Sequence, residues 1–215
     1  HRDLHSFPTR RSSDLRLASR LYPNFWRVPT DNDEGGGRSS FAHRWRAAGL
    51  DSLNWQAQGL SWQQISPDLM EVTALQSAAG KKGTIHVKMI YRLQGNGDLE
   101  VQMHTELDGS WPPLPRVGVQ MQLAGSLNNL EWYGRGPFES YWDRCTAANV
   151  GWYQGSVEQQ HFPYVMPQEN GSKSDVRWLS LTDASQTGVK IMALPRLQFT
   201  VHDYTDQALD RKSVV

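Results

Sequence analysis

The chain has 215 residues, and its 22 basic and 22 acidic side chains cancel. A chain of this length accommodates one domain of the larger all-β kind. The balanced charge provides no field that would attract nucleic acid or an anionic membrane, so neither is expected as a partner. The sequence has no apolar run of membrane-helix length and no signal-like N-terminal segment, which favours a cytoplasmic location. The single Cys145 excludes an internal disulfide and a Cys-based zinc site.

The two ends of the chain differ in character from the rest. Residues 1–15 are basic, serine-rich and aperiodic, and residues 211–215 look similar, so we expect foreign tails on either side of a domain at residues 16–210. The first tract resembles translated adapter sequence. It is not a kinase catalytic loop, although its first four letters mimic one, because Pro8 stands where that loop has an asparagine. We therefore expect a fragment that is incomplete at its C-terminus.

A short helix is predicted between residues 40 and 49. Ser39 or Ser40 can cap its start, and Gly49 can end it as a left-handed residue. The apolar residues between them recur at helical spacing, at Phe41, Trp45 and Ala48.

The clearest strand signal lies in residues 84–107. Apolar and polar residues alternate on both sides of a turn at 95–98 (GNGD), which predicts an antiparallel hairpin with one buried face. Similar runs predict further strands at residues 55–65, 70–76, 117–123, 150–157, 176–181, 189–194 and 197–202. Strands at short intervals, separated by turn residues, indicate an all-β fold. We predict a large antiparallel β-sandwich of about ten or eleven strands with one short helix.

Residues 132–141 (WYGRGPFESY), followed by Asp143 and Arg144, show neither the strand period of 2 nor the helical period of 3.6. That pattern predicts ordered irregular backbone. Gly134 and Gly136 permit unusual dihedral angles there, and Pro137 fixes the chain direction. Such a loop suits either the binding of a flat-faced polar ligand such as a sugar, or a structural corner that locks two sheets together.

This motif resembles the WYGRGPxExYxDR segment in the C-terminal domain of glycoside hydrolase family 2 β-galactosidases. Further segments match the same domain in the same order, namely residues 24–33 (NFWRVPTDND), 114–118 (LPRVG), 163–171 (PYVMPQENG), 175–178 (DVRW) and 199–209. Together they span residues 21–210. The resemblance implies a supersandwich of the galactose-mutarotase kind, and an enzyme that hydrolyses terminal β-linked galactose, as in lactose.

By the same resemblance, both catalytic carboxylates belong to a (β/α)₈ barrel that this sequence does not encode, so no catalytic residue is expected here. The domain would support that barrel, in the same or a companion polypeptide, and would wall one side of the pocket for a galactoside substrate. Assembly as a homo-oligomer is expected. No cofactor is expected in this chain, because the family's magnesium and sodium ions bind in other domains.

The resemblance also implies that the loop beginning at Asp33 reaches the rim of the substrate pocket. The candidates for that rim come from this loop and from the matched segments: Asp33, Glu34, Arg38, Trp132, Arg135, Glu139, Glu169 and Asn170. The acidic run at residues 31–34 resembles a cation loop, but Gly35 and Ala42 stand where an EF-hand needs acidic ligands. We favour a turn whose side chains bond the local backbone, and we predict no metal site.

Arginines of the matched segments are expected mainly as clamps to Asp31, Glu139 or Asp175; they are Arg27, Arg116, Arg135, Arg144 and Arg177. Most of the tryptophans are expected in the core. Three of them are candidates for surface roles, at Trp45, Trp132 and Trp142.

Two other functions stay open. An aldose epimerase needs a histidine acid and a glutamate base, and His161 with Glu169 is the available pair. A non-catalytic carbohydrate-binding module would instead use exposed rings, with Trp132, Tyr133 and Trp142 as its platforms.

Overall fold

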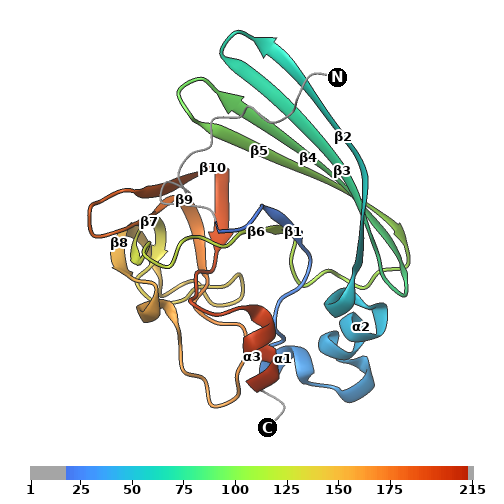
Figure 1. Cartoon of the computed structure of the whole chain (residues 1–215). Helices are drawn as coiled ribbons and strands as arrows, with labels where there is room; N and C mark the ends of the chain where they lie inside the picture. The colour runs from blue at the N-terminus through green and yellow to red at the C-terminus, as the bar shows by residue number, and fades with distance from the viewer. Residues whose placement is uncertain (1–17, 213–215) are drawn as a thin grey trace. The chain divides into compact units, whose positions relative to one another are not determined.

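The computed structural model describes residues 18–212, which are mainly antiparallel strands (Figure 1). The chain divides into two compact units. One unit comprises residues 22–120, and the other comprises residues 121–212 together with residues 18–21. The tail expected at residues 1–15 lies outside the described residues, as do the last three residues of the tail expected at 211–215.

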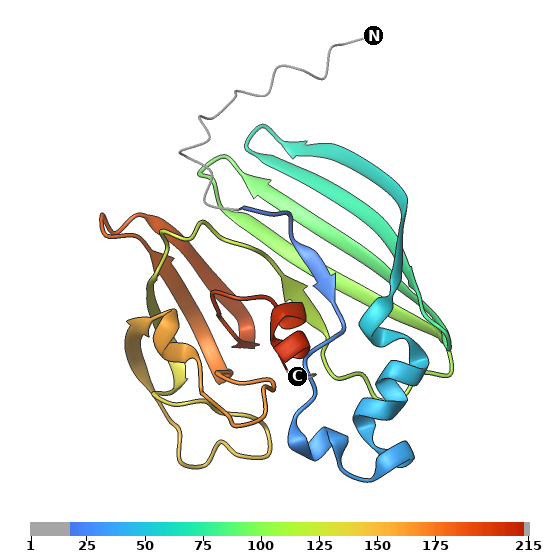
Figure 2. The ribbon, with the colours of Figure 1, turned by 60° about the horizontal axis from the view of Figure 1, so that its bottom comes forward.

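The unit of residues 22–120 is built around one sheet of four long strands. They lie in the order β2-β3-β4-β5, and all three pairings are antiparallel (Figure 2). Two short strands, β1 and β6, pair separately. The elements of this unit are β1 (Tyr22–Asn24), α1 (Asp31–Glu34), η2 (Gly37–Ser39), α2 (Phe41–Ala48), η3 (Leu50–Ser52), β2 (Asn54–Ser66), β3 (Leu69–Ala79), β4 (Gly83–Gln94), β5 (Leu99–Gly109) and β6 (Gly118–Gln120).

The hairpin expected at residues 84–107 is confirmed as β4 and β5. Ile85, Val87 and Met89 of β4 are buried, while His86 and Lys88 between them are exposed. Residues that pair directly across antiparallel strands share a face of the sheet. The buried face therefore extends from β4 to its neighbours and forms the core of this unit.

Helix α2 confirms the expected helix and both of its caps. The backbone N–H of His43 donates to the side chain of Ser40, 3.1 Å away, and Gly49 adopts a left-handed φ of 78°. Trp45 is only 3% exposed and donates its indole N–H to the carbonyl of Pro113 at 2.8 Å. The prediction of a surface role for Trp45 was therefore wrong, because its ring anchors the helix in the core.

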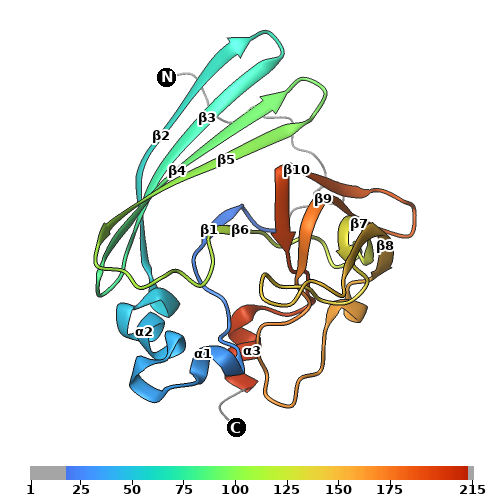
Figure 3. The same cartoon turned by 180° about the vertical axis from the view of Figure 1, so that it is seen from behind.

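The second unit contains a four-stranded antiparallel sheet in the order β10-β9-β7-β8 (Figure 3). Its core gathers apolar side chains from β7, β9 and the segment before β7, including Leu127, Leu130, Trp132, Val176 and Leu179. The elements are β7 (Asn129–Gly136), β8 (Asn149–Ser156), η4 (Glu158–Gln160), β9 (Lys173–Thr182), β10 (Gly188–Phe199) and α3 (Asp206–Lys212).

Strand β7 corrects the prediction of irregular backbone in the first half of the 132–141 motif. Leu130, Trp132, Gly134 and Gly136 all face inward, so the strand does alternate. Glycines occupy two of the inward positions because there is no room for a side chain: a Cβ at Gly134 would lie 2.6 Å from Cγ2 of Val176. The missing side chains concealed the period from the sequence. Residues 137–144 are irregular, as expected.

Two further expectations need correction. The strands predicted at residues 189–194 and 197–202 form one strand, β10, whose register against β9 shifts between Met192 and Leu197. Instead of the one predicted helix, the described residues contain three short α-helices, since α1 and α3 were not foreseen. The all-β, antiparallel class is confirmed, and this content is consistent with a β-sandwich.

Candidate functional site

Two loops of the second unit, at residues 137–148 and 161–172, are tied together at the carboxylate of Glu139. The hydroxyl of Tyr164 donates to Oε1, Arg144 pairs with the same oxygen at 2.7 Å, and the backbone N–H of Gly171 donates to Oε2 at 2.8 Å. The Glu139 side chain is 8% exposed. An arginine clamp on Glu139 was expected, and Arg144 provides it; both carboxylate oxygens are bonded to protein groups.

A second group of ion pairs is centred on Asp175 of β9, which it joins to β7 and β10. Arg135 of β7 pairs with Oδ2 at 2.7 Å, and Arg196 of β10 pairs with Oδ1 at 2.9 Å. Arg135 also donates to the carbonyls of Cys145 and Ala148 and so fixes the loop after β7. The hydrogen bond from Arg135 holds the pKa of Asp175 below its usual range. The expected clamp from Arg135 is confirmed, and Arg196 is an addition that the sequence reading missed.

Two polar groups of this unit, the ammonium of Lys173 and the hydroxyl of Tyr141, are buried. Lys173 is 2% exposed; its Nζ donates to the carbonyl of Gly171 at 3.3 Å and lies 5.4 Å from the centre of the Trp132 ring. Burial lowers the pKa of its ammonium group to about 8, although Glu139 acts in the opposite direction. Burial also raises the pKa of Tyr141, and its hydroxyl has no hydrogen-bond partner within the described residues.

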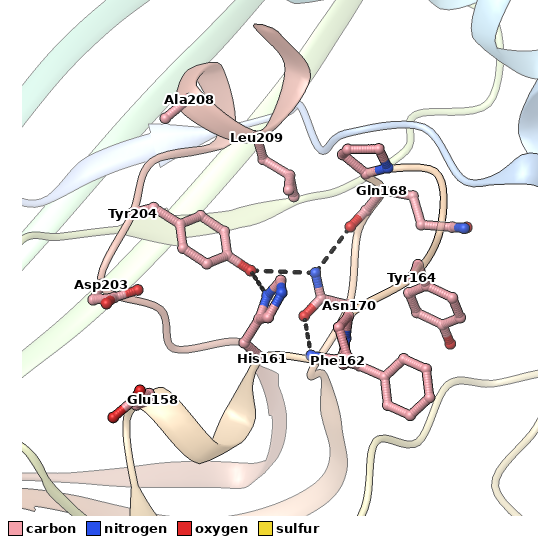
Figure 4. A pocket seen from close by; sticks show the side chains of 12 residues that line it. Glu158, His161, Phe162, Tyr164, Gln168, Asn170, Asp203, Tyr204, Ala208 and Leu209 are labelled. Atoms are coloured by element: carbon pink, nitrogen blue, oxygen red, sulfur yellow. Dashed lines mark hydrogen bonds between the residues drawn. The ribbon is translucent and has the colours of Figure 1, made fainter. Parts of the chain in front are cut away.

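A pocket of about 360 Å³ lies in the same unit, beside the 161–170 loop (Figure 4). Its walls come from η4, from that loop, and from residues 203–209, which include the start of α3. Buried Asn170 and Leu209 line it. Glu158, Phe162, Tyr164, Asp203 and Tyr204 also line it.

The hydroxyl of Tyr204 is the centre of a hydrogen-bond network beside this pocket (Figure 4). It shares a 2.7 Å hydrogen bond with Nδ1 of His161 and accepts one from Nδ2 of Asn170 at 3.2 Å. The imidazole of His202 stacks on the Tyr204 ring at 4.5 Å between ring centres. Asn170 is itself fixed, because it also accepts from the N–H of Phe162 and donates to a carbonyl. These contacts hold the pocket side chains rigidly.

The candidate rim residues near the N-terminus lie in the other unit, around α1. Asp33 is 8% exposed and accepts two hydrogen bonds from Arg27, at 2.6 and 3.1 Å. It also accepts from the N–H and hydroxyl of Thr30. Burial raises the pKa of Asp33, but these hydrogen bonds outweigh it and leave the pKa below its usual value. Glu34 pairs with Arg46 at 2.7 Å, and Arg38 is exposed.

The contacts of these residues test several predictions made from the sequence. The clamp from Arg27 exists, but it reaches Asp33 rather than Asp31. The acidic run is a one-turn helix that bonds the backbone of Thr30, in keeping with the expected local role. Among residues 18–212, no three His, Cys, Asp or Glu side chains gather in a group that could hold a metal ion. The pair proposed for an epimerase is separated in role, since His161 lines the pocket while Glu169 is buried and bonds Thr200.

The aromatic residues proposed as platforms differ in exposure. Trp132 is 1% exposed and donates to the carbonyl of Arg135, so the prediction of a surface role or sugar platform was wrong for this ring. Trp142 is 89% exposed and Tyr133 is 41% exposed, so both rings could still contact a ligand. The sequence reading missed Asp203 and Tyr204 as pocket residues. Their only signal was their place in the 199–209 segment of the family resemblance.

Comparison with known proteins identifies the family. Residues 4–214 match the family model described as beta galactosidase small chain. The chain belongs to the beta galactosidase small chain family. The resemblance seen across residues 21–210 is thereby confirmed.

Curated members related to this chain are named β-galactosidases. One from Priestia megaterium (strain DSM 319 / IMG 1521) is 32% identical over 194 residues, which are 90% of this chain and 18% of the relative. One from Vibrio cholerae (serotype O1, Classical Ogawa 395) is 31% identical over 201 residues, or 91% of this chain and 19% of the relative. The chain thus spans less than a fifth of these relatives. In the part of the chain that the structure describes, no helix is long and apolar enough to cross a membrane.

Proposed function

We propose that this chain is a supporting domain of a β-galactosidase that hydrolyses terminal β-linked galactose, as in lactose. The catalytic carboxylates would belong to a (β/α)₈ barrel in the same or a companion polypeptide. The observation that carries the proposal is the engagement of Asp33, Glu139 and Asp175 in ion pairs and hydrogen bonds within the family motifs. A retaining glycosidase needs two carboxyl groups about 5 Å apart facing the sugar. Carboxylates locked in this way hold loops instead of attacking a substrate.

The proposal gives the candidate rim residues two kinds of role. The exposed side chains of Glu34 and Arg38 would help to shape the substrate entrance, with Asp33 anchoring their segment. Asn170, which belongs to the other unit, is buried and would fix the loop that carries it. Four buried or paired residues would act from behind by holding the loops in place: Trp132, Arg135, Glu139 and Glu169. Homo-oligomeric assembly, supported by the family resemblance alone, and a cytoplasmic location, expected from the sequence, are also part of the proposal.

The two loops joined at Glu139 supply a surface on which the catalytic part could dock. Trp142 is 89% exposed, and Val165 and Met166 of the other loop are 99% and 53% exposed. Exposed apolar side chains of this size are typical of interaction surfaces when they gather in one patch. The ion pair of Arg144 with Glu139 keeps both loops in register, so these apolar groups would be presented as one docking surface.

A chimera tests the proposal. The corresponding segment of the Priestia megaterium relative is replaced by this chain, and hydrolysis of a nitrophenyl β-galactoside is measured for the chimera and for this chain alone. We expect turnover only in the chimera. Trp142→Ser with Val165→Ser should lower it by weakening docking, whereas Met192→Ser, an exposed apolar residue of β10, should not. Turnover by the isolated chain would refute the proposal.

A further inference from the structure

Strand β2 lies at one edge of the four-stranded sheet in the unit of residues 22–120 (Figure 1). It pairs with β3 on one side, and no other strand of the described residues pairs with its other side. Every residue of β2 except the last is exposed. Alternate residues of an edge strand direct their backbone N–H and C=O groups away from the sheet, so β2 presents a row of donors and acceptors that the sheet leaves unpaired.

The two edges of this sheet differ in charge. Strand β5, at the opposite edge, carries Glu100, Glu106 and Asp108, and charged side chains on an edge strand discourage a further strand from pairing with it. Strand β2 has 13 residues, and none of them is charged or a proline. A long, uncharged edge strand is a typical site of pairing with another chain, and pairing at β2 would bury no charge of its own.

Residues 59–64 form the regular stretch of β2, because the pairing with β3 shifts register before and after them. Leu60 and Trp62 of this stretch point to one face, since side chains alternate along a strand. They are 74% and 67% exposed. The same face carries the buried Met89 of β4, which is aligned with Leu60 through Ala74 of β3. An apolar face that is covered at β4 is therefore open to solvent at the edge.

We propose that β2 pairs antiparallel with β2 of a second copy of this chain, about a two-fold axis at Ser61. An antiparallel edge is complementary to itself, since a two-fold axis perpendicular to the sheet brings each donor opposite an acceptor. With Ser61 opposite its symmetry mate, residues 59–63 pair entirely within the regular stretch. Leu60 of each copy then lies opposite Trp62 of the other, and these cross-strand pairs cover apolar surface that is exposed in the single chain. The two four-stranded sheets become one continuous sheet.

The assembly should close at a dimer. Each copy has one uncharged edge, because acids mark the β5 edge, and a two-fold contact occupies the β2 strand of both copies. The inference names a surface for the homo-oligomeric assembly included in the proposed function. It does not rest on the galactosidase part of that proposal, so association of this chain alone tests it.

Sedimentation of the full chain over a range of concentrations tests the contact, and we expect a particle of twice the mass of one chain. Ser61→Lys places like charges opposite each other at the axis and should weaken dimerisation by about tenfold, as should Ser61→Glu. An equimolar mixture of the two variants should restore the dimer, because the facing charges are then opposite. Met192→Lys, at an exposed apolar position on the sheet of the other unit, is the matched control and should leave the dimer unchanged.

Disulfide crosslinking tests the register in a Cys145→Ala background. Cα atoms directly opposite each other in an antiparallel pair are about 4.5 to 5.5 Å apart, within reach of a disulfide. Ser61→Cys should therefore give covalent dimers under mild oxidation. The two copies of Gln63 would lie about 13 Å apart, at roughly 3.4 Å per residue along the strand. Gln63→Cys, also at an exposed position of β2, should therefore give none.

Three results would overturn the proposal. A monomer at every concentration would show that β2 does not pair with itself. A dimer that is unchanged by Ser61→Lys would place the contact elsewhere, on the sheet of β10 if Met192→Lys dissociates it. Species larger than a dimer would show that β5 pairs as well. Both substituted positions are exposed, so folding should be retained, as thermal melting would verify. None of these outcomes depends on whether the chimera with the Priestia megaterium relative hydrolyses galactosides.

Discussion

Replacing Lys173 by methionine should stabilise the fold. The ammonium group is buried at the start of β9, and burial lowers its pKa from 10.5 to about 8. That difference corresponds to about 3 kcal/mol of penalty for keeping the charge at pH 7. Its position over the Trp132 ring returns about 1 kcal/mol as a cation–π interaction. Methionine has a similar length and no charge, but it leaves the Gly171 carbonyl without this donor, at a cost of about 1 kcal/mol. Lys173→Met should therefore raise the free energy of unfolding by about 1 kcal/mol.

The pH dependence gives an independent measure of the same effect. Between pH 8 and 10.5 the folded chain has released the Lys173 proton while the unfolded chain still carries it. The contribution of Lys173 to stability therefore rises with pH through that window, and it should be lost in Lys173→Met. Urea unfolding followed by tryptophan fluorescence at pH 7 and pH 9.5 would measure both effects.

Lys190→Met is the matched control. Lys190 also lies over a tryptophan, 4.6 Å from the ring centre of Trp178, but its side chain is exposed. Its loss should cost a few tenths of a kcal/mol, because a cation–π contact at an exposed site is weak. If Lys173→Met instead lowered the free energy of unfolding by more than the control does, the charge would be favourably held and the argument from burial would be refuted.

Three other changes test separate features. Burial lowers the pKa of His202 to about 4, so stability should fall by up to about 3 kcal/mol as pH drops from 6.5 to 4, and urea unfolding of His202→Gln should show a smaller fall. Gly134→Ala should cost about 3 kcal/mol by calorimetry because Cα of Val176 would lie 2.8 Å away, whereas Gly125→Ala, with open space around it, should be nearly neutral. Asp175→Asn keeps a side chain that tolerates φ 55° but loses two ion pairs, so thermal unfolding should show a loss of about 1 kcal/mol.

Local signals were readable from the sequence. The helix at residues 41–48 follows from the cap at Ser40 and the left-handed glycine at Gly49, and each acts within one turn of the chain. The β4–β5 hairpin could be predicted because its side chains alternate between a solvent-exposed and a buried face. Strand β7 could not be read because its inward positions include Gly134 and Gly136, whose lack of a side chain is set by the distant Val176 and Tyr153.

The candidate site was only partly readable for the same reason. The clamps of Arg135 and Arg144 could be inferred because the arginines and their acids lie within the matched segments. The pocket could not, since it forms where residues 158–170 meet residues 203–209, about forty positions later. Asp203 lies in no periodic pattern, and its place in the same pocket as Glu158 depends on how the chain turns after β10.

The carboxylates of this chain are of two kinds: some accept hydrogen bonds and ion pairs from the protein, and others do not. Acids inside the family motifs, such as Glu139 and Asp175, accept two or more hydrogen bonds or ion pairs from the protein. A carboxylate saturated by the protein has little capacity left for a ligand, and removing it disturbs the loops that it joins. Glu158 lies outside the matched segments and Asp203 lies in the one at residues 199–209, yet no side chain of the described residues donates to either carboxylate. Mutation of Glu139 or Asp175 should thus lower stability, whereas mutation of Glu158 or Asp203 should leave it nearly unchanged.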